Sequence, residues 1–93
     1  MIRSFADRKT EALFREGRCA AAWRLFEAVA LRKLDMLRAA KTLVDLRAPP
    51  GNRLEKLKGD HAGQWSIRIN DQWRVWFRWT DDGPADVEIT DYH

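Results

Sequence analysis

The segment EITDYH ends in three side chains that can all transfer protons. Asp91 carries a carboxyl group, Tyr92 a phenol and His93 an imidazole, and the three follow one another directly. Histidine titrates near neutral pH, with an ordinary pKa of about 6.5, so His93 is the natural proton carrier of the three. The roles of base and acid stay open among them. The alternative interpretation is a frayed strand end in which Tyr92 packs as an anchor.

Two arginines, Arg68 and Arg74, lie on either side of residues 70–72 and could hold an anion. A hairpin with these three residues as its loop places Arg68 directly opposite Arg74. Because facing like charges destabilise an antiparallel pair, we expect the guanidinium groups to spread into water, to pair with Glu88, or to hold a phosphate between them. Trp76 shares their face, where it could stack a nucleobase or be covered by another part of the chain.

The segment RLEKLKGDH adds further cations upstream of these arginines. If RLEKLK is a strand, Lys56 and Lys58 share one face, Glu55 lies on the other, and Arg53 stands at the strand's start. A charge run of this kind is typical of a solvated sheet edge. Together with the facing arginines, it indicates an anion-binding site. His61 follows in a polar loop and is interpreted as a surface residue.

Alternation of apolar and polar residues predicts the strands that carry these side chains. The register that keeps the apolar set on one face aligns Ile69 with Trp73, Ile67 with Val75, and Trp65 with Phe77. DDGP predicts the next turn, and DVEITDY predicts a further strand with Val87 and Ile89 on the apolar face. Asp91 continues that face, and Tyr92 the opposite one.

The first half of the chain predicts helices that cover this sheet. Asp7 is a suitable N-cap for a helix that ends at Gly17, and IRSF before it predicts a short strand. Between about residues 20 and 40, apolar residues recur at helical spacing, which predicts one amphipathic helix. Its apolar face comprises Phe26, Val29, Ala30, Leu34 and Leu37. TLVDL predicts one further helical turn, and RAPPGN separates the helical half from the strands.

Length and composition bound the fold. The chain has 93 residues, 45% of them hydrophobic and five of them tryptophan, which predicts one folded domain spanning residues 1–93. Helices followed by alternating strands predict an α+β fold, with N-terminal helices packed on one face of a small antiparallel β-sheet.

Charge and the remaining residue types bound the partners. The net charge of +3 suits a polyanion without requiring one. No stretch approaches the roughly 18 apolar residues of a membrane span, and the start of the chain lacks a signal-peptide pattern. We therefore expect a cytoplasmic protein without a membrane partner. Cys19 and two histidines provide no zinc-site spacing, so neither a metal nor a cofactor is expected.

These segments resemble the HigB toxins, the plasmid-maintenance "killer" branch of the RelE/ParE superfamily. The resemblance covers nearly the whole chain, and its most specific elements are LKG, WSIRIN, QWRVWF and DYH. It implies a toxin whose helices pack on an antiparallel sheet. It also implies a ribosome-dependent endoribonuclease that cleaves messenger RNA in the ribosomal A site. The implied partner is a helix-turn-helix, HigA-like antitoxin encoded in the neighbouring gene.

The resemblance also implies the site residues. The implied catalytic set is Lys58 of LKG, Arg74 of QWRV, and Asp91, Tyr92 and His93 of DYH. We expect Arg53, Lys56, Arg68 and Trp76 to contact RNA. In a metal-free cleavage, the ribose 2′-hydroxyl attacks the neighbouring phosphorus, so the site must move protons and neutralise phosphoryl charge. Some members have a histidine where Glu55 stands, which leaves proton transfer to His93 and Tyr92.

Two other functions fit part of the sequence. A ParE-like toxin that binds DNA gyrase needs no acid–base pair, so DYH would be idle. A basic RNA-binding domain would keep the arginines without arresting growth. A helix-turn-helix protein in the adjacent reading frame would favour a toxin over a solitary RNA binder.

Overall fold

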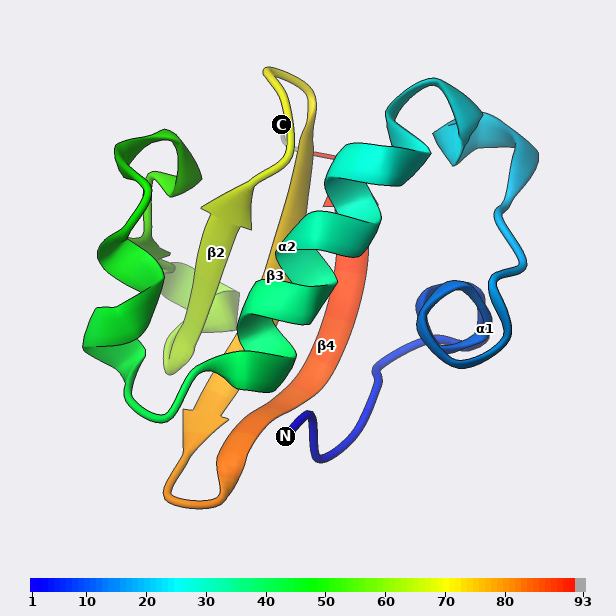
Figure 1. Cartoon of the computed structure of the whole chain (residues 1–93). Helices are drawn as coiled ribbons and strands as arrows, with labels where there is room; N and C mark the ends of the chain where they lie inside the picture. Colours follow the sequence, from blue (N-terminus) through cyan, green and yellow to red (C-terminus); the bar gives the residue numbers. More distant parts are fainter. Residues whose placement is uncertain (92–93) are drawn as a thin grey trace.

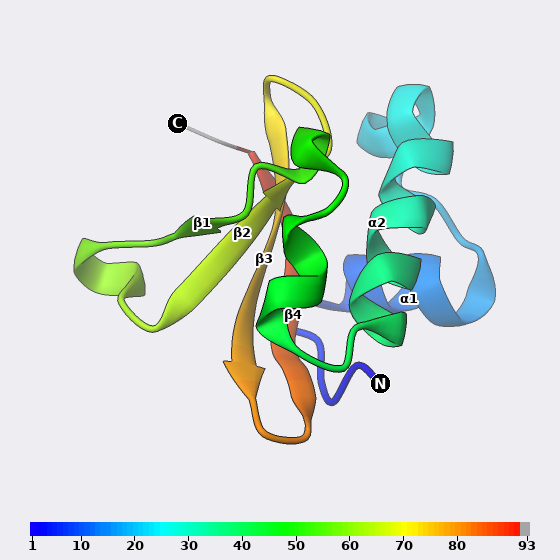
Figure 2. The same ribbon diagram turned by 60° about the vertical axis from the view of Figure 1, so that its left-hand side comes forward.

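Two α-helices and a four-stranded antiparallel sheet make up the fold in the computed structural model, which describes residues 1–91. The elements are α1 (Arg8–Glu16), α2 (Glu27–Ala39), β1 (Glu55–Lys56), β2 (Gln64–Arg68), β3 (Trp73–Thr80) and β4 (Gly83–Asp91). The strands follow one another across the sheet in the order β1-β2-β3-β4. Both helices lie on the same side of the sheet (Figures 1 and 2). The predicted α+β architecture is confirmed.

The β2–β3 hairpin has the predicted register. Ile67 pairs with Val75, and Arg68 with Arg74. The amide of Ile69 donates to the carbonyl of Trp73 at 3.0 Å, which closes the loop of residues 70–72. The Asn70 side-chain oxygen accepts the amides at positions 72 and 73 at 2.9 and 2.8 Å, an arrangement typical of Asx turns. The loop chemistry thus fixes the pairing that hydrophobic alternation predicts.

The core lies between the sheet and the helices. The inward face of the sheet is fully buried at four central positions, Ile67, Val75, Phe77 and Val87. Leu34 and Leu37 of α2 are equally buried against this face. Trp65 and Trp73 are only half-buried, at the margin of the core. The predicted core is confirmed.

α1 begins and ends where the sequence predicts. The Asp7 carboxylate accepts the Thr10 amide at 2.7 Å, and Gly17 ends the helix with φ of 71°. The buried Thr10 hydroxyl also accepts the amide of Ile89 at 3.0 Å, which ties α1 to β4. Thr10 therefore takes part in the N-cap of α1 through its amide and in the contact with the sheet through its hydroxyl.

The single helix predicted for residues 20–40 is wrong in its first third. Ala21–Phe26 form a 3₁₀ helix, and α2 starts only at Glu27. Trp23 and Phe26 are both buried and both pack on Trp73, at ring-centroid distances of 6.4 and 5.4 Å. A 3₁₀ helix, with three residues per turn, places these two positions on one face. Packing against Trp73 thus accounts for the tighter helix.

The further helical turn predicted at TLVDL is separate from α2. Leu43–Arg47 form a 3₁₀ helix with its own capping box, in which Thr42 and Asp45 satisfy each other's backbone amides. Ala40, with ψ of 131°, is extended and interrupts the helical path between the two.

Two predicted strands are shorter than expected. IRSF pairs with β4 through one parallel bridge, Phe5 with Val87, supported by hydrogen bonds at Arg3, Ser4 and Ala6. RLEKLK contributes only the two residues of β1. Arg53 stands before β1 in the left-handed region with φ of 45°, and Gly59 follows it with φ of 66°. Extended backbone therefore cannot continue far in either direction.

Within residues 1–91, no helix has the length and apolarity that crossing a membrane requires.

Candidate functional site

The sheet face turned away from α1 and α2 carries three of the predicted site residues, Arg68, Arg74 and Trp76. Arg68 on β2 is paired with Arg74 on β3, which is paired with Thr90 on β4. Two residues further along the strands, Trp76 lies between its partners Ser66 and Glu88. Paired residues point to the same face of a sheet. We call this surface the arginine face, and its predicted sharing by Arg68, Arg74 and Trp76 is confirmed.

The guanidinium groups of the arginine face are engaged at the hairpin loop. Arg68 pairs with the carboxylate of Asp71, and Arg74 donates to two backbone carbonyl groups beside the loop. The hydrogen bond and charge of Arg68 lower the pKa of Asp71, and the charges of Arg53 and Arg74 add to this effect. Three arginines therefore act on one exposed carboxylate, and Asp71, in place of the predicted Glu88, is the counter-charge of Arg68.

Trp76 is partly covered by the loop that follows β1. The ring of His61 lies against the Trp76 ring edge-on, at 4.5 Å between centroids and 61° between planes. His61 is exposed, as predicted, but its contact with Trp76 was not predicted. Gly59 and Gly63 hold positive φ angles of 66° and 91°, in the region of backbone conformation that favours glycine. These two glycines in GDHAG were the sequence signal for a loop that folds back.

Glu88 is a titratable residue of the arginine face whose burial the sequence did not predict. It is half-buried beside Trp76, and burial raises its pKa, with the charge of Asp7 as the next cause and that of His61 opposing it. A half-buried carboxyl group with a raised pKa is a common feature of sites that transfer protons. The sequence predicted Glu88 only as a counter-charge for the arginines.

Asp91 lies at the same end of the sheet as the arginines but on the other face. It pairs with Trp73, one position beyond the pair of Arg74 with Thr90. The Gln72 side-chain amide donates to the Asp91 carboxylate at 3.0 Å. The predicted side for Asp91 is confirmed. Tyr92 and His93 lie outside the described residues, so their predicted roles stay predictions.

Lys56 does not share the arginine face. In the two-residue β1, Lys56 pairs with Trp65 and Glu55 pairs with Ser66. Ser66 lies on the arginine face, whereas Trp65 belongs to the apolar side of the sheet. Glu55, and not the lysine, therefore points towards the arginine face, and the predicted grouping of Lys56 with the arginines is wrong.

Lys58 lies at the far end of the sheet from the arginines. It follows Leu57, whose amide donates to the carbonyl of Gln64 at 2.9 Å. Gln64 is the first residue of β2 and Arg68 the last, so about 13 Å of strand separates them at roughly 3.3 Å per residue. Strand register thus places the Lys58 backbone away from Arg74, although the sequence suggested that they were neighbours.

Residues 1–91 contain no cluster of three or more histidine, cysteine, aspartate or glutamate side chains that could hold a metal ion.

Comparison with known proteins places these features in a family. Toxin HigB-1 of Vibrio cholerae serotype O1 is 54% identical over 50 residues, which are 54% of this chain and 53% of the relative. The chain thus matches about half the length of the first curated relatives. Endoribonuclease HigB of Proteus vulgaris is 26% identical over 99 aligned positions that cover all of both chains.

A solved structure and a family profile complete the comparison. The YoeB/ParE toxin from Agrobacterium tumefaciens is 26% identical, with a TM-score of 0.48 over 77% of this chain and 84% of its own. Residues 3–93 match the profile of a family described as the RelE-like toxin of the type II toxin–antitoxin system HigB. Because this match takes in both helices, all four strands and the DYH segment, the chain belongs to the HigB-like family of RelE-like type II toxins.

Proposed function

We propose that this toxin is an endoribonuclease that cleaves messenger RNA in the ribosomal A site without a metal ion. The observation that carries the proposal is the pairing of Arg68 with Arg74 on the sheet face opposite α1 and α2, where the charge of Arg53 acts on the same hairpin. Guanidinium groups bind phosphate oxygens through paired hydrogen bonds. The name of the Proteus relative, which aligns over its full length, supports the endoribonuclease part of this proposal.

In the proposed reaction, the ribose 2′-oxygen attacks phosphorus and the 5′-oxygen leaves. The base takes the 2′-hydroxyl proton, and the acid donates a proton to the leaving oxygen, so a 2′,3′-cyclic phosphate forms. His93 and Tyr92 are the proposed proton carriers, and Asp91 orients them. Arg74 neutralises the phosphoryl oxygens, which become more negative in the transition state.

The surrounding cations bind the rest of the RNA in this proposal. Arg53 and Arg68 hold the phosphates next to the scissile one, and Trp76 stacks a base. Lys56 and Lys58, at the sheet edge, contact the chain further along. Lys58 acts in catalysis only if its flexible side chain reaches back to the scissile phosphate.

Partners and location follow from the same proposal. Membership of a type II family implies an antitoxin. We infer that it is a helix-turn-helix, HigA-like protein encoded in the neighbouring gene, and that toxin, ribosome and messenger RNA meet in the cytoplasm.

The test is single-turnover cleavage of messenger RNA on programmed ribosomes. Deletion of His93, and separately Tyr92→Phe, should slow the chemical step by about 10²–10⁴-fold, the usual contribution of a positioned proton-transfer group. Arg74→Ala should abolish cleavage, and Arg74→Lys should restore it only in part, because a point charge replaces a two-pronged donor.

Arg78→Ala is the matched control. Arg78 lies on the same strand and face as Arg74, but it is exposed at the other end and pairs with Asp86 at 3.0 Å. The Arg78→Ala variant should therefore cleave at nearly the parental rate. If the His93 deletion, Tyr92→Phe and Arg74→Ala all cut at the parental rate, the nuclease proposal fails. A supercoiling assay with DNA gyrase would then test the ParE-like alternative.

A further inference from the structure

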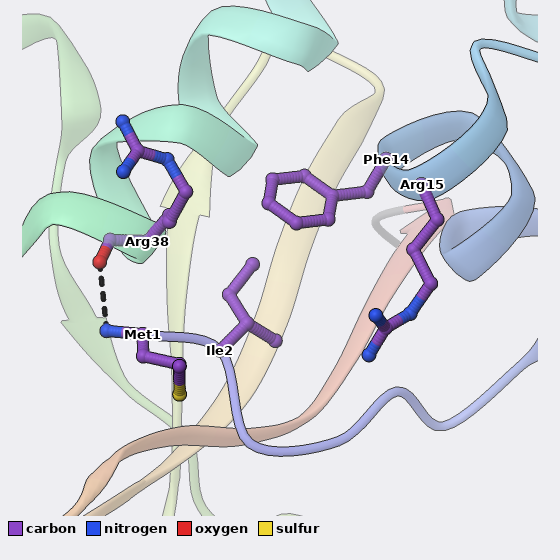
Figure 3. Close-up of a pocket in the computed structure, with 5 residues that line it drawn as sticks. All are labelled: Met1, Ile2, Phe14, Arg15 and Arg38. Atoms are coloured by element: carbon purple, nitrogen blue, oxygen red, sulfur yellow. Dashed lines mark hydrogen bonds between the residues drawn. The ribbon is translucent and has the colours of Figure 1, made fainter.

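A pocket of about 370 Å³ opens on the helical side of the molecule, where the first residues of the chain meet α1 and α2 (Figure 3). Its lining residues are Met1, Ile2, Phe14, Arg15 and Arg38. The volume is within the range of small binding cavities. None of these residues belongs to the arginine face, so the pocket is not part of the site described above.

The floor of the pocket is apolar and already formed. Ile2 is buried, and the half-buried Phe14 side chain lies next to it between the two helices. Phe14 packs on Phe5 with 5.7 Å between ring centroids. The backbone nitrogen of Met1 donates to the Arg38 carbonyl at 2.7 Å, which fixes the first residues against the end of α2. A ligand would therefore meet a surface that needs little reordering, which lowers the cost of binding.

Two guanidinium groups from different helices stand at the rim. Arg15 of α1 pairs with Glu11 at 2.9 Å, and Arg38 of α2 pairs with Asp35 at 2.8 Å. All four side chains are about half exposed. Exposed ion pairs of this kind contribute little to stability, so a carboxylate from another molecule can replace the internal partner at small cost. The guanidinium of Arg3, which contacts the Met1 sulfur, adds a third positive group nearby.

We propose that this pocket docks a segment of the antitoxin in which a large apolar side chain stands beside a carboxylate. The apolar side chain covers Phe14 and Ile2, and the carboxylate pairs with Arg15 or Arg38. Apolar cores with charged rims are the usual anatomy of protein interfaces. A second copy of this chain fits less well, because each copy carries a net charge of +3.

The test measures the dissociation constant of the complex with the cognate antitoxin at fixed ionic strength. The double variant Arg15→Glu/Arg38→Glu should weaken binding at least about tenfold, because it sets like charge against the incoming carboxylate. The matched control is Arg18→Glu/Arg47→Glu, two exposed arginines outside the pocket with the same change in charge. It should stay within about twofold of the parent. Equal affinity of the rim variant and the parent, or equal loss in both double variants, would overturn the proposal.

Hydrogen exchange gives a second readout that does not depend on a substitution. On antitoxin binding, protection should rise in the segments that contain residues 1–5, 14–15 and 38. Protection confined to the strands that carry the arginine face would contradict the proposal. So would a concentration-dependent dimer of the toxin alone that the rim variant abolishes, because the occupant would then be a second copy. Binding is measured without RNA, so the outcome does not depend on the nuclease activity.

Discussion

At the scale of single residues, the positive charge of the arginine face is partly neutralised by a neighbouring carboxylate, that of Asp71. Arg68 lowers the pKa of Asp71 most strongly, and the charges of Arg53 and Arg74 lower it further. The Asp71 side chain is almost fully exposed, so it can leave this position when a phosphate arrives. The hairpin loop thus supplies a competitor for the anion that the arginines are proposed to bind.

Asp71→Asn should tighten RNA binding, because it removes the negative group nearest to Arg68. The expected change is a several-fold lower dissociation constant and a steeper dependence on salt, since more guanidinium charge is available to phosphates. A fluorescence titration with a short RNA at several salt concentrations measures both. Asp82→Asn, in the exposed turn between β3 and β4, is the control with the same charge change. Identical salt slopes for both variants would show that Asp71 does not shield the arginines.

Glu88→Gln should stabilise the protein at neutral pH. Because the pKa of Glu88 is raised in the folded protein, folding favours its protonated form. In the parent protein, the stability that protonated Glu88 contributes is therefore lost as the pH rises from about 4.5, the pKa of the unfolded chain, through the higher pKa of the folded protein. In urea unfolding experiments between pH 4 and 8, the free energy of unfolding should fall less with rising pH for Glu88→Gln than for the parent. The exposed Glu55→Gln should retain the parental slope.

At the scale of elements, one buried polar contact links α2 to the loop before the sheet. The Lys33 ammonium donates to the Asn52 side-chain oxygen at 2.5 Å, and the Asn52 amide donates to the carbonyls of Leu46 and Ala48 at 3.1 and 3.2 Å. Both Lys33 and Asn52 are buried. These bonds hold the RAPPGN segment against the helix and so position the start of β1.

Lys33→Met should remove part of the pH dependence of the free energy of unfolding above pH 7. Burial lowers the pKa of Lys33 from 10.5, with the charges of Arg32 and Arg68 as further causes. A lysine with a lowered pKa binds fewer protons when folded, so parental stability should rise with pH until about 10.5. Unfolding measured from pH 7 to 10 should lose this rise in Lys33→Met. The exposed Lys9→Met should keep it, and an unchanged rise in Lys33→Met would assign it to other groups.

Elements that follow local rules could be predicted, and elements shaped by distant contacts could not. Alternation and the Asn70 turn gave the β2–β3 register, and Asp7 with Gly17 gave the limits of α1. The 3₁₀ helix at Ala21–Phe26 depends on packing against a residue about fifty positions away, which no local pattern contains.

The same distinction applies to the candidate site. The alternation that aligned Arg68 with Arg74 also placed Trp76 on their face. The positions of Lys56 and Lys58 depended on how a two-residue strand joins the edge of the sheet. The contact of His61 with Trp76 depended on the fold of an irregular loop. Gly59 and Gly63 signal that this loop folds back, but no residue pattern specifies where the loop or the edge strand packs.

At the scale of the whole molecule, one core joins the helical layer to the sheet, so unfolding should be a single cooperative event. Phe77→Ala should lower the free energy of unfolding by about 3–5 kcal/mol, because it removes a fully buried ring. Circular dichroism and tryptophan fluorescence should report the same urea midpoint. Val44→Ala, at an exposed position, is the control and should cost little. Separate midpoints for the two signals would show that the layers unfold independently.

The parallel bridge between Phe5 and Val87 also bears on the order of events during synthesis. Residues 3–6 leave the ribosome long before residues 84–87, which supply their backbone hydrogen-bond partners, have been made. Helices can form as they emerge, but β3 has no β4 beside it until residues 83–91 have been made. We therefore expect the nascent chain to lack the complete toxin fold until β4 has left the ribosome. A cell that makes this protein would gain a short interval in which a partner can capture the chain before it is complete.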